Sequence, residues 1–238
     1  MSSNLAIKLR ETTKKPHTSS ENQGFVKCFL KGVVEPNSLK KLIASLYFVY
    51  SALEEEIQRN LENSIVKAMY FHDLNRRANL EEDLKFYYGE NWRAEIPYLP
   101  GAERFVERIR AISSEEPELL IAHAYTRYMG DLSGGQSFRK IIQTGLNLEG
   151  DRGNAFYNFS NIGDLNAFKG RYRQALNELE VDEAQADRIA AEAERSFKLS
   201  RGLFHDLEAD LIAAIGRDEF DRLTRDRRAG STESAVAQ

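Results

Sequence analysis

The sequence predicts an all-α protein that folds as a single domain. Apolar residues recur at steps of three and four along almost the whole chain, a spacing that places them on one face of a helix. No shift in composition marks a linker, and no internal repeat is visible. The longest stripe needs a helix of about 35 Å at a rise of about 1.5 Å per residue; its eight positions are Ala186, Ile189, Ala193, Phe197, Ser200, Phe204, Leu207 and Leu211.

Turn-forming residues divide the chain into helical segments joined by connections of ordinary length. The breaks fall at residues 32–37, 88–91, 97–101, 145–154 and 161–164. After the first break, one helix face is predicted from Leu39, Leu42, Ile43, Leu46, Val49, Tyr50 and Leu53. Helix caps are predicted at Ser38, Asp164 and Asp182, because their side chains accept hydrogen bonds from the free N–H groups of a first turn.

Three glycines interrupt the otherwise helix-forming segment from Leu119 to Ile142, namely Gly130, Gly134 and Gly135. Together they cost about 3 kcal/mol relative to alanine, at about 1 kcal/mol each. A glycine allows another surface to approach the backbone closely. With the carboxylate of Asp131 among them, they indicate a flat ligand lying against a helix. Close packing of two helices, and a break or hinge near residues 133–135, remain as alternatives.

Beyond residue 216 the chain is charged and then small and polar. We therefore expect residues 1–216 to form the folded domain and residues 217–238 to be a polar, flexible tail.

The composition, with 42% hydrophobic and 29% charged residues, is that of an ordinary globular protein. A net charge of −4 argues against nucleic-acid binding. No run of 18 apolar residues predicts a membrane span or anchor, and no apolar stretch near the start predicts a signal peptide. Cys28 is the only cysteine, which excludes an internal disulfide and favours a reducing compartment; its apolar neighbours predict a buried thiol.

His17 and Glu21 are four residues apart and share a face if the segment is helical. An imidazole can then bind iron through one ring nitrogen while the other faces a carboxylate that orients the ring. The alternative is an exposed histidine beside a solvated charge. Of the other histidines, His123 lies among apolar residues and is predicted to belong to the core, whereas His72 and His205 stand in polar contexts.

Other chemistries lack their residues. No pair of Glu-x-x-His motifs supports a di-iron site, no Gly-x-Ser-x-Gly elbow supports a hydrolase, and the glycine segment fits no phosphate loop. Several cations form a solvated face unless a subset converges on a dicarboxylate ligand, which spacing cannot establish: Arg10, Lys14, Lys15, Lys169, Arg171 and Arg173.

Four separate segments together resemble the heme oxygenase family. Residues 117–136 (PELLIAHAYTRYMGDLSGGQ) are similar to its distal-helix signature, and residues 15–22 (KPHTSSEN) to its proximal-histidine segment. Residues 45–56 and 168–173 match as well, and the resemblance extends from Leu5 to about Leu211. It implies a multi-helical fold that holds heme between a proximal helix and a kinked distal helix.

The resemblance also implies roles for individual residues. His17 is the iron ligand and Glu21 its hydrogen-bonding partner, while Gly130 and Gly134 bring backbone close to the heme. Asp131 organises water above the iron. Further implied positions are the distal polar groups Tyr50 and Arg127, the propionate-side groups Arg10, Tyr125, Lys169 and Arg173, and the pocket residues Phe197 and Phe204. One departure is Ser200, where relatives carry asparagine near the distal water.

The implied reaction cleaves heme b, at once substrate and cofactor, with O2 to biliverdin IXα, carbon monoxide and ferrous iron. The chain is most similar to the soluble cyanobacterial and plastid members, which take electrons from ferredoxin. Implied partners are therefore ferredoxin and a downstream bilin reductase of phycobilin synthesis, and the implied location is the cytoplasm or a plastid stroma. A heme or bilin carrier and a cofactor-free helical interaction protein are the alternatives.

Overall fold

The structure is a computed structural model that describes residues 4–230, and within this range every regular element is helical. The prediction of an all-α class is confirmed. The α-helices are α1 (Leu5–Glu21), α2 (Gly24–Leu30), α3 (Pro36–Arg59), α4 (Ser64–Ala68), α5 (Arg77–Tyr88), α6 (Trp92–Glu95), α7 (Pro100–Glu115), α8 (Leu120–Asp131), α9 (Gly135–Gly145), α10 (Leu165–Glu178), α11 (Glu183–His205), α12 (Glu208–Ile215) and α13 (Arg217–Thr224). Short 3-10 turns lie at His72–Leu74, Pro117–Leu119 and Ala155–Tyr157.

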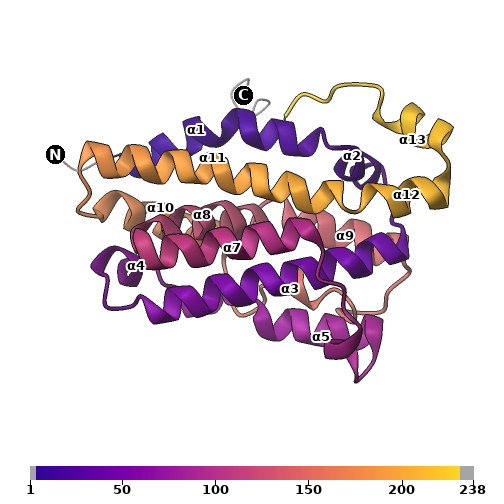
Figure 1. Cartoon of the computed structure of the whole chain (residues 1–238), viewed down its shortest axis with the longest axis horizontal. Coiled ribbons are helices and arrows are strands. Elements are labelled where there is room, and N and C mark those ends of the chain that lie inside the picture. The colour runs from indigo at the N-terminus through magenta and orange to yellow at the C-terminus, as the bar shows by residue number, and fades with distance from the viewer. Residues whose placement is uncertain (1–3, 231–238) are drawn as a thin grey trace.

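The long helices form one layered bundle. Helix α1 packs along α11, which also contacts α7 and α8, and α3 packs between α7 and α5 (Figure 1). Their apolar faces share one core, in which Leu9, Leu53, Trp92 and Tyr172 are fully buried. None of the helices between residues 4 and 230 has the length and apolar character needed to cross a bilayer.

The long apolar stripe belongs to two helices rather than one. Helix α11 ends at His205, and Leu207 and Leu211 reach the core from the start of α12. At the junction the Asp206 carboxylate accepts a hydrogen bond of 2.6 Å from the backbone N–H of Gly101 on α7. Periodicity alone cannot detect such a break, because the stripe stays buried on both sides of it.

Two of the three predicted helix caps are confirmed. The Asp164 side chain accepts from the first turn of α10, and Asp182 forms a capping box with Gln185 at the start of α11. The prediction for Ser38 is wrong. Helix α3 begins at Pro36, whose fixed φ suits a first turn, and the Glu35 carboxylate accepts from Asn37 and Ser38 N–H groups.

The segment after residue 216 differs from the predicted tail. Residues 217–224 form α13, whose Phe220 and Leu223 are buried against the bundle. Two apolar side chains on one face of a short helix are enough to dock it, although the segment is polar on average. The structure describes the chain as far as Gly230, and residues 231–238 of the predicted tail lie outside the described residues.

A polar seam runs between α8 and α11. Its buried centre is Glu192, whose Oε1 lies 2.9 Å from His123 Nε2 and whose two oxygens accept from Arg108 at 2.9 and 2.7 Å. One turn further along, the hydroxyls of Thr126 and Ser196 are 2.6 Å apart. His123 is thus a core histidine, as the sequence predicts, but it is held by a carboxylate that the sequence did not indicate.

We expect Glu192→Gln to lower the free energy of unfolding at pH 7 by about 3 kcal/mol, because it leaves buried partners without their charge. Burial would raise the pKa of Glu192, but hydrogen bonds from His123 and Arg108 outweigh this effect and hold the pKa at about 2. A carboxyl with a lowered folded pKa stabilises above its unfolded value and loses this contribution as pH falls.

The difference between wild type and variant should therefore shrink as pH falls from about 4.5 towards about 2. Denaturant unfolding at several pH values measures it. Glu194→Gln, a half-buried change on the same helix, serves as the control and should leave the unfolding free energy nearly unchanged. Equal losses in the two variants would contradict the assignment.

Candidate functional site

The first component of the site is His17 near the end of α1. Its Nδ1 is buried, makes no hydrogen bond within the described residues and lies 3.7 Å from Glu21 Oε2. Burial lowers the pKa of the imidazole, and the charge of Glu21 opposes this effect without outweighing it. The lowered pKa favours the neutral ring that a metal requires. The edge of Phe197 on α11 contacts the same ring, with centroids 5.7 Å apart. The spacing of four residues therefore does bring His17 and Glu21 together.

The second component is the broken segment formed by α8 and α9, which we call the distal segment. The α-helix is interrupted between Asp131 and Gly135, although Leu132 and Gly134 keep right-handed helical dihedral angles. A Cβ atom added to Gly130 would meet nothing within 4 Å, and one added to Gly134 only the Gly130 carbonyl oxygen at 3.8 Å. A Cβ added to Gly135 would lie 3.0 Å from Tyr157. Helix packing therefore accounts for Gly135, whereas Gly130 and Gly134 border open space.

A buried polar network lies next to these glycines. The Tyr50 hydroxyl on α3 donates to Asp131 Oδ2, and Asp131 is only 5% exposed. Burial raises the pKa of Asp131 to about 6, opposed by the charge of Arg127 and the hydrogen bond from Tyr50. Arg127 also donates to Ser200 Oγ at 3.4 Å. An acid whose pKa is near neutrality can take up and release protons at physiological pH.

Positively charged groups from two helices act on Tyr125 of α8. Burial raises the pKa of this phenol, while the neighbouring hydroxyl of Thr13 and the charges of Arg173 and Arg10 lower it. These cations come from α1 and α10, two helices far apart in the sequence, and both are near enough for their charges to affect the same phenol. Lys169 is placed differently: it acts on Asp164, the cap of its own helix.

An aromatic row links α11 and α2 to α9 and includes residues that the sequence did not single out. Phe204 of α11 stacks on Phe25 of α2 at 6.1 Å, Phe25 contacts Phe29 at 5.9 Å, and Phe29 contacts Phe138 of α9 at 4.9 Å. The row therefore joins the segment after His17 to the distal segment. Phe204 belongs to this row, whereas Phe197 contacts His17 directly. A helical periodicity predicts such rings as core, but not which of them line a site.

The heme oxygenase family model matches residues 3–206 of the chain. The chain belongs to the heme oxygenase family. Heme oxygenase 1 of Nostoc sp. is 55% identical over 238 residues and covers both chains completely. The crystal structure of heme oxygenase-2 from Synechocystis sp. in complex with heme and NO superposes with a TM-score of 0.96 at 50% identity, over 97% of this chain and 96% of that one. The crystal structure of heme oxygenase-1 from Synechocystis sp. in complex with heme superposes with a TM-score of 0.87 at 53% identity, over 92% of this chain and 99% of that one.

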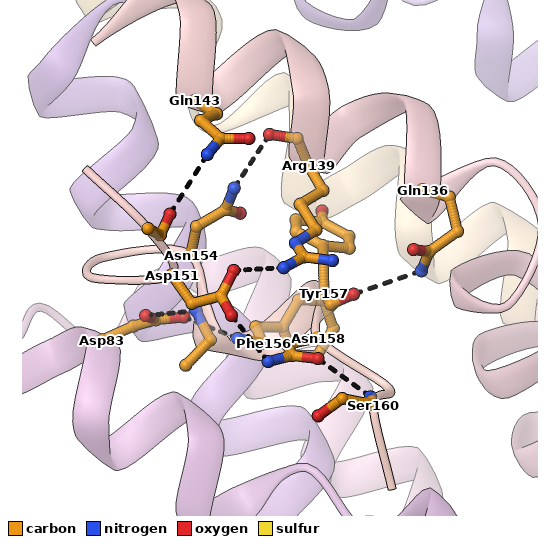
Figure 2. A network of polar contacts seen from close by, with 12 residues as sticks. Asp83, Gln136, Arg139, Gln143, Asp151, Asn154, Phe156, Tyr157, Asn158 and Ser160 are labelled. Carbon is orange, nitrogen blue, oxygen red and sulfur yellow. Dashed lines mark hydrogen bonds and ion pairs between the residues drawn. The ribbon is translucent and has the colours of Figure 1, made fainter. Parts of the chain in front are cut away.

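Family membership confirms the resemblance that the four motifs indicate. The loop after α9 forms hydrogen bonds with the distal segment and with α5, contacts that the sequence did not indicate (Figure 2). Asp83 on α5 accepts from the backbone N–H groups of Ala155 and Phe156 at 2.8 Å, and Gln136 Nε2 donates to the Tyr157 carbonyl at 3.1 Å. Tyr157 is thereby held against Gly135.

The same loop is tied to the outer face of α9 by a second set of contacts (Figure 2). Asp151 pairs with Arg139 through one oxygen and accepts from Asn158 at 2.8 Å through the other. The Asn154 amide donates to the Arg139 carbonyl at 2.8 Å. The loop that packs against Gly135 through Tyr157 is thus held to α9 by several side-chain contacts.

A cavity of about 700 Å³ lies elsewhere, around the start of α5. Its lining is almost entirely polar or charged, with Ala78 as the one apolar member: Glu54, His72, Asp73, Asn75, Arg76, Arg77, Ala78, Asn79, Glu81, Asn158, Ser160 and Asn161. A porphyrin needs apolar walls for its two faces. This cavity therefore does not fit heme, and it contains none of the site residues predicted from the sequence.

Substituting leucine at two of the glycines should separate ligand contact from helix packing. Gly130→Leu should fold with undiminished stability, because the side chain enters open space and improves helix propensity by up to about 1 kcal/mol, yet it should weaken hemin binding at least about tenfold. Gly135→Leu should lose about 1–3 kcal/mol of stability by overpacking against Tyr157. Thermal unfolding without heme and hemin titration measure the two effects. Hemin affinity unchanged in Gly130→Leu would favour an empty surface there.

Proposed function

We propose that this heme oxygenase binds heme b between α1 and the distal segment and cleaves it with O2 to biliverdin IXα, carbon monoxide and ferrous iron. The observation that carries the proposal is the pairing of two glycines bordering open space, Gly130 and Gly134, with a buried Asp131 at the end of α8 between them in the sequence. Heme supplies the redox-active iron that activates O2 and is itself the substrate. The similar Synechocystis heme oxygenases were crystallised in complex with heme, which supports the same ligand.

On the proximal side His17 would hold the iron, and Glu21 would orient the ring through Nδ1. The buried Nδ1 without a hydrogen-bonding partner fits that role, since a ring bound through the other nitrogen presents an N–H there. Phe197 packs against the imidazole, and Phe204, which stacks on Phe25, would line the pocket. Arg10, Tyr125 and Arg173 would bind the propionates, joined by Lys169 one turn before Arg173 on α10.

On the distal side the chain's own residues hold and deliver a proton. Tyr50 fixes the Asp131 carboxyl by its hydrogen bond, and Arg127 limits how far burial raises the Asp131 pKa. Ordered water between Asp131 and the reacting ligand would carry the proton. Ser200 Oγ accepts from Arg127 and donates to the Ser196 carbonyl at 2.9 Å, so the shorter side chain at this position still anchors the arginine.

We further propose reduced ferredoxin as the electron donor and a bilin reductase as the consumer of biliverdin, which would supply phycobilin synthesis. The similarity to Nostoc and Synechocystis proteins supports this assignment. The reaction would take place in the cytoplasm, or in the plastid stroma of a eukaryote.

A single-turnover assay tests the proposal. Hemin added to the purified protein should give a sharp Soret band at one equivalent, and ferredoxin with its reductase should then convert the pigment to biliverdin IXα, identified by chromatography. Carbon monoxide is trapped with ferrous myoglobin. A Soret band without pigment conversion would favour a carrier, and the absence of the band would reject the heme site.

A further inference from the structure

The last turns of α1, which carry His17, have a weak hydrogen-bond ladder of their own. Pro16 lies inside the helix and removes one backbone donor. The hydroxyls of Thr18 and Ser20 donate back to the carbonyls of Lys14 and Pro16, at 3.2 and 3.1 Å, a pattern that often bends helices. This end of α1 therefore gains more from the elements that pack against it than a helix end with a full set of backbone donors would.

The C-terminal segment, residues 217–230, packs there, and we call it the clasp. After α13 the chain turns back across α2 towards α1 (Figure 1). The Asn22 side chain pairs with Arg228 twice, donating to its carbonyl at 3.1 Å and accepting from its N–H at 2.9 Å. Gly230 lies directly against Thr18, since a Cβ added to it would be 1.9 Å from Thr18 Oγ1.

The clasp is also fastened along α2. Lys27 Nζ donates to the Thr224 carbonyl at 2.8 Å, and Lys31 Nζ to the Leu223 carbonyl at 2.6 Å. Gly24 leaves room for the Phe220 ring, because a Cβ there would lie 2.3 Å from Phe220 Cζ. These contacts hold residues 220–224 of the clasp against α2.

We propose that the clasp is a positioning element for the proximal ligand, which holds the last turn of α1 through Thr18 and Asn22 and so fixes the orientation of His17 and slows the release of heme. Thr18 directly follows His17, and Asn22 directly follows Glu21. All four residues therefore lie on adjoining faces of the same turns. The inference rests on the proposed function, because it takes His17 as the heme ligand.

Gly230→Leu tests the clasp without altering α1, because its side chain cannot fit against Thr18. Ala229→Leu is the matched control, since Ala229 is exposed. We would measure the transfer of hemin from the full chain to excess apomyoglobin. Transfer from Gly230→Leu should be on the order of tenfold faster than from wild type or control, and a tenfold change in rate corresponds to about 1.4 kcal/mol. The iron–imidazole stretching frequency of the ferrous protein should shift in the same variant only.

Trypsin cleavage after Arg225, Arg227 and Arg228 should also be faster in Gly230→Leu without heme, a measure that needs no turnover. Equal transfer rates in the three proteins, an equal increase in both variants, or unchanged cleavage would each overturn the clasp. Failure of wild type to bind hemin would instead reject the proposed function, so the two failures are distinguishable.

Discussion

Asp131→Ala should retain hemin binding but lose biliverdin formation, with turnover reduced by about 10²–10⁴-fold, the range typical of a removed general acid or base. Asp131 is the carboxyl closest in sequence to the open backbone at Gly130 and Gly134, and its pKa of about 6 suits proton exchange near neutrality. Alanine fits the buried position but cannot hold a proton or organise water. Stopped-flow spectroscopy of single turnovers measures the loss.

Tyr50→Phe is a milder substitution in the same hydrogen-bond network as Asp131→Ala. It removes the hydrogen bond to Asp131 while keeping the ring, which packs against Tyr128 with centroids 5.8 Å apart. We expect a smaller fall in turnover, because the carboxyl remains but is less well fixed. Unchanged turnover in Asp131→Ala would refute the proton-delivery role, whereas loss of hemin binding would show that the side chain acts structurally.

His17→Ala should lower hemin affinity by at least about 100-fold, beyond the 10- to 100-fold typical when only an outer partner of a metal ligand is removed. It should also change the Soret band and abolish turnover. The other described histidines are unsuited to replace it. His123 is buried against Glu192, His205 is exposed at the C-terminal end of α11, and His72 lines the polar cavity that does not fit heme.

Exogenous imidazole should restore part of the Soret band in His17→Ala, because the side-chain volume removed can admit the free ring. His205→Ala is the matched control and should behave as wild type, given that the His205 side chain is 78% exposed. A wild-type spectrum in His17→Ala would place the iron ligand elsewhere and contradict the proximal assignment.

Local chemistry made part of the fold predictable. The apolar spacing from Leu39 to Leu53 and the acidic caps at Asp164 and Asp182 depend on neighbours within a few residues. The prediction of a cap at Ser38 was wrong because the Glu35 carboxylate, which the sequence did not single out, accepts hydrogen bonds from the N–H groups of the first turn. The docking of α13 escaped prediction because its two buried side chains gain their partners from α2, far away in the chain.

The sequence by itself determined the helical class, the family and an unexplained cluster of three glycines beside a carboxyl, since each is a property of short segments. Only the tertiary structure decided that Gly135 packs against Tyr157 while Gly130 and Gly134 border open space. It also decided that the charges of Arg10 and Arg173, from two distant helices, both act on Tyr125. The physical reason is the same in each case: whether a position faces a neighbour or a void is fixed by elements distant in sequence, and helix periodicity carries no information about them.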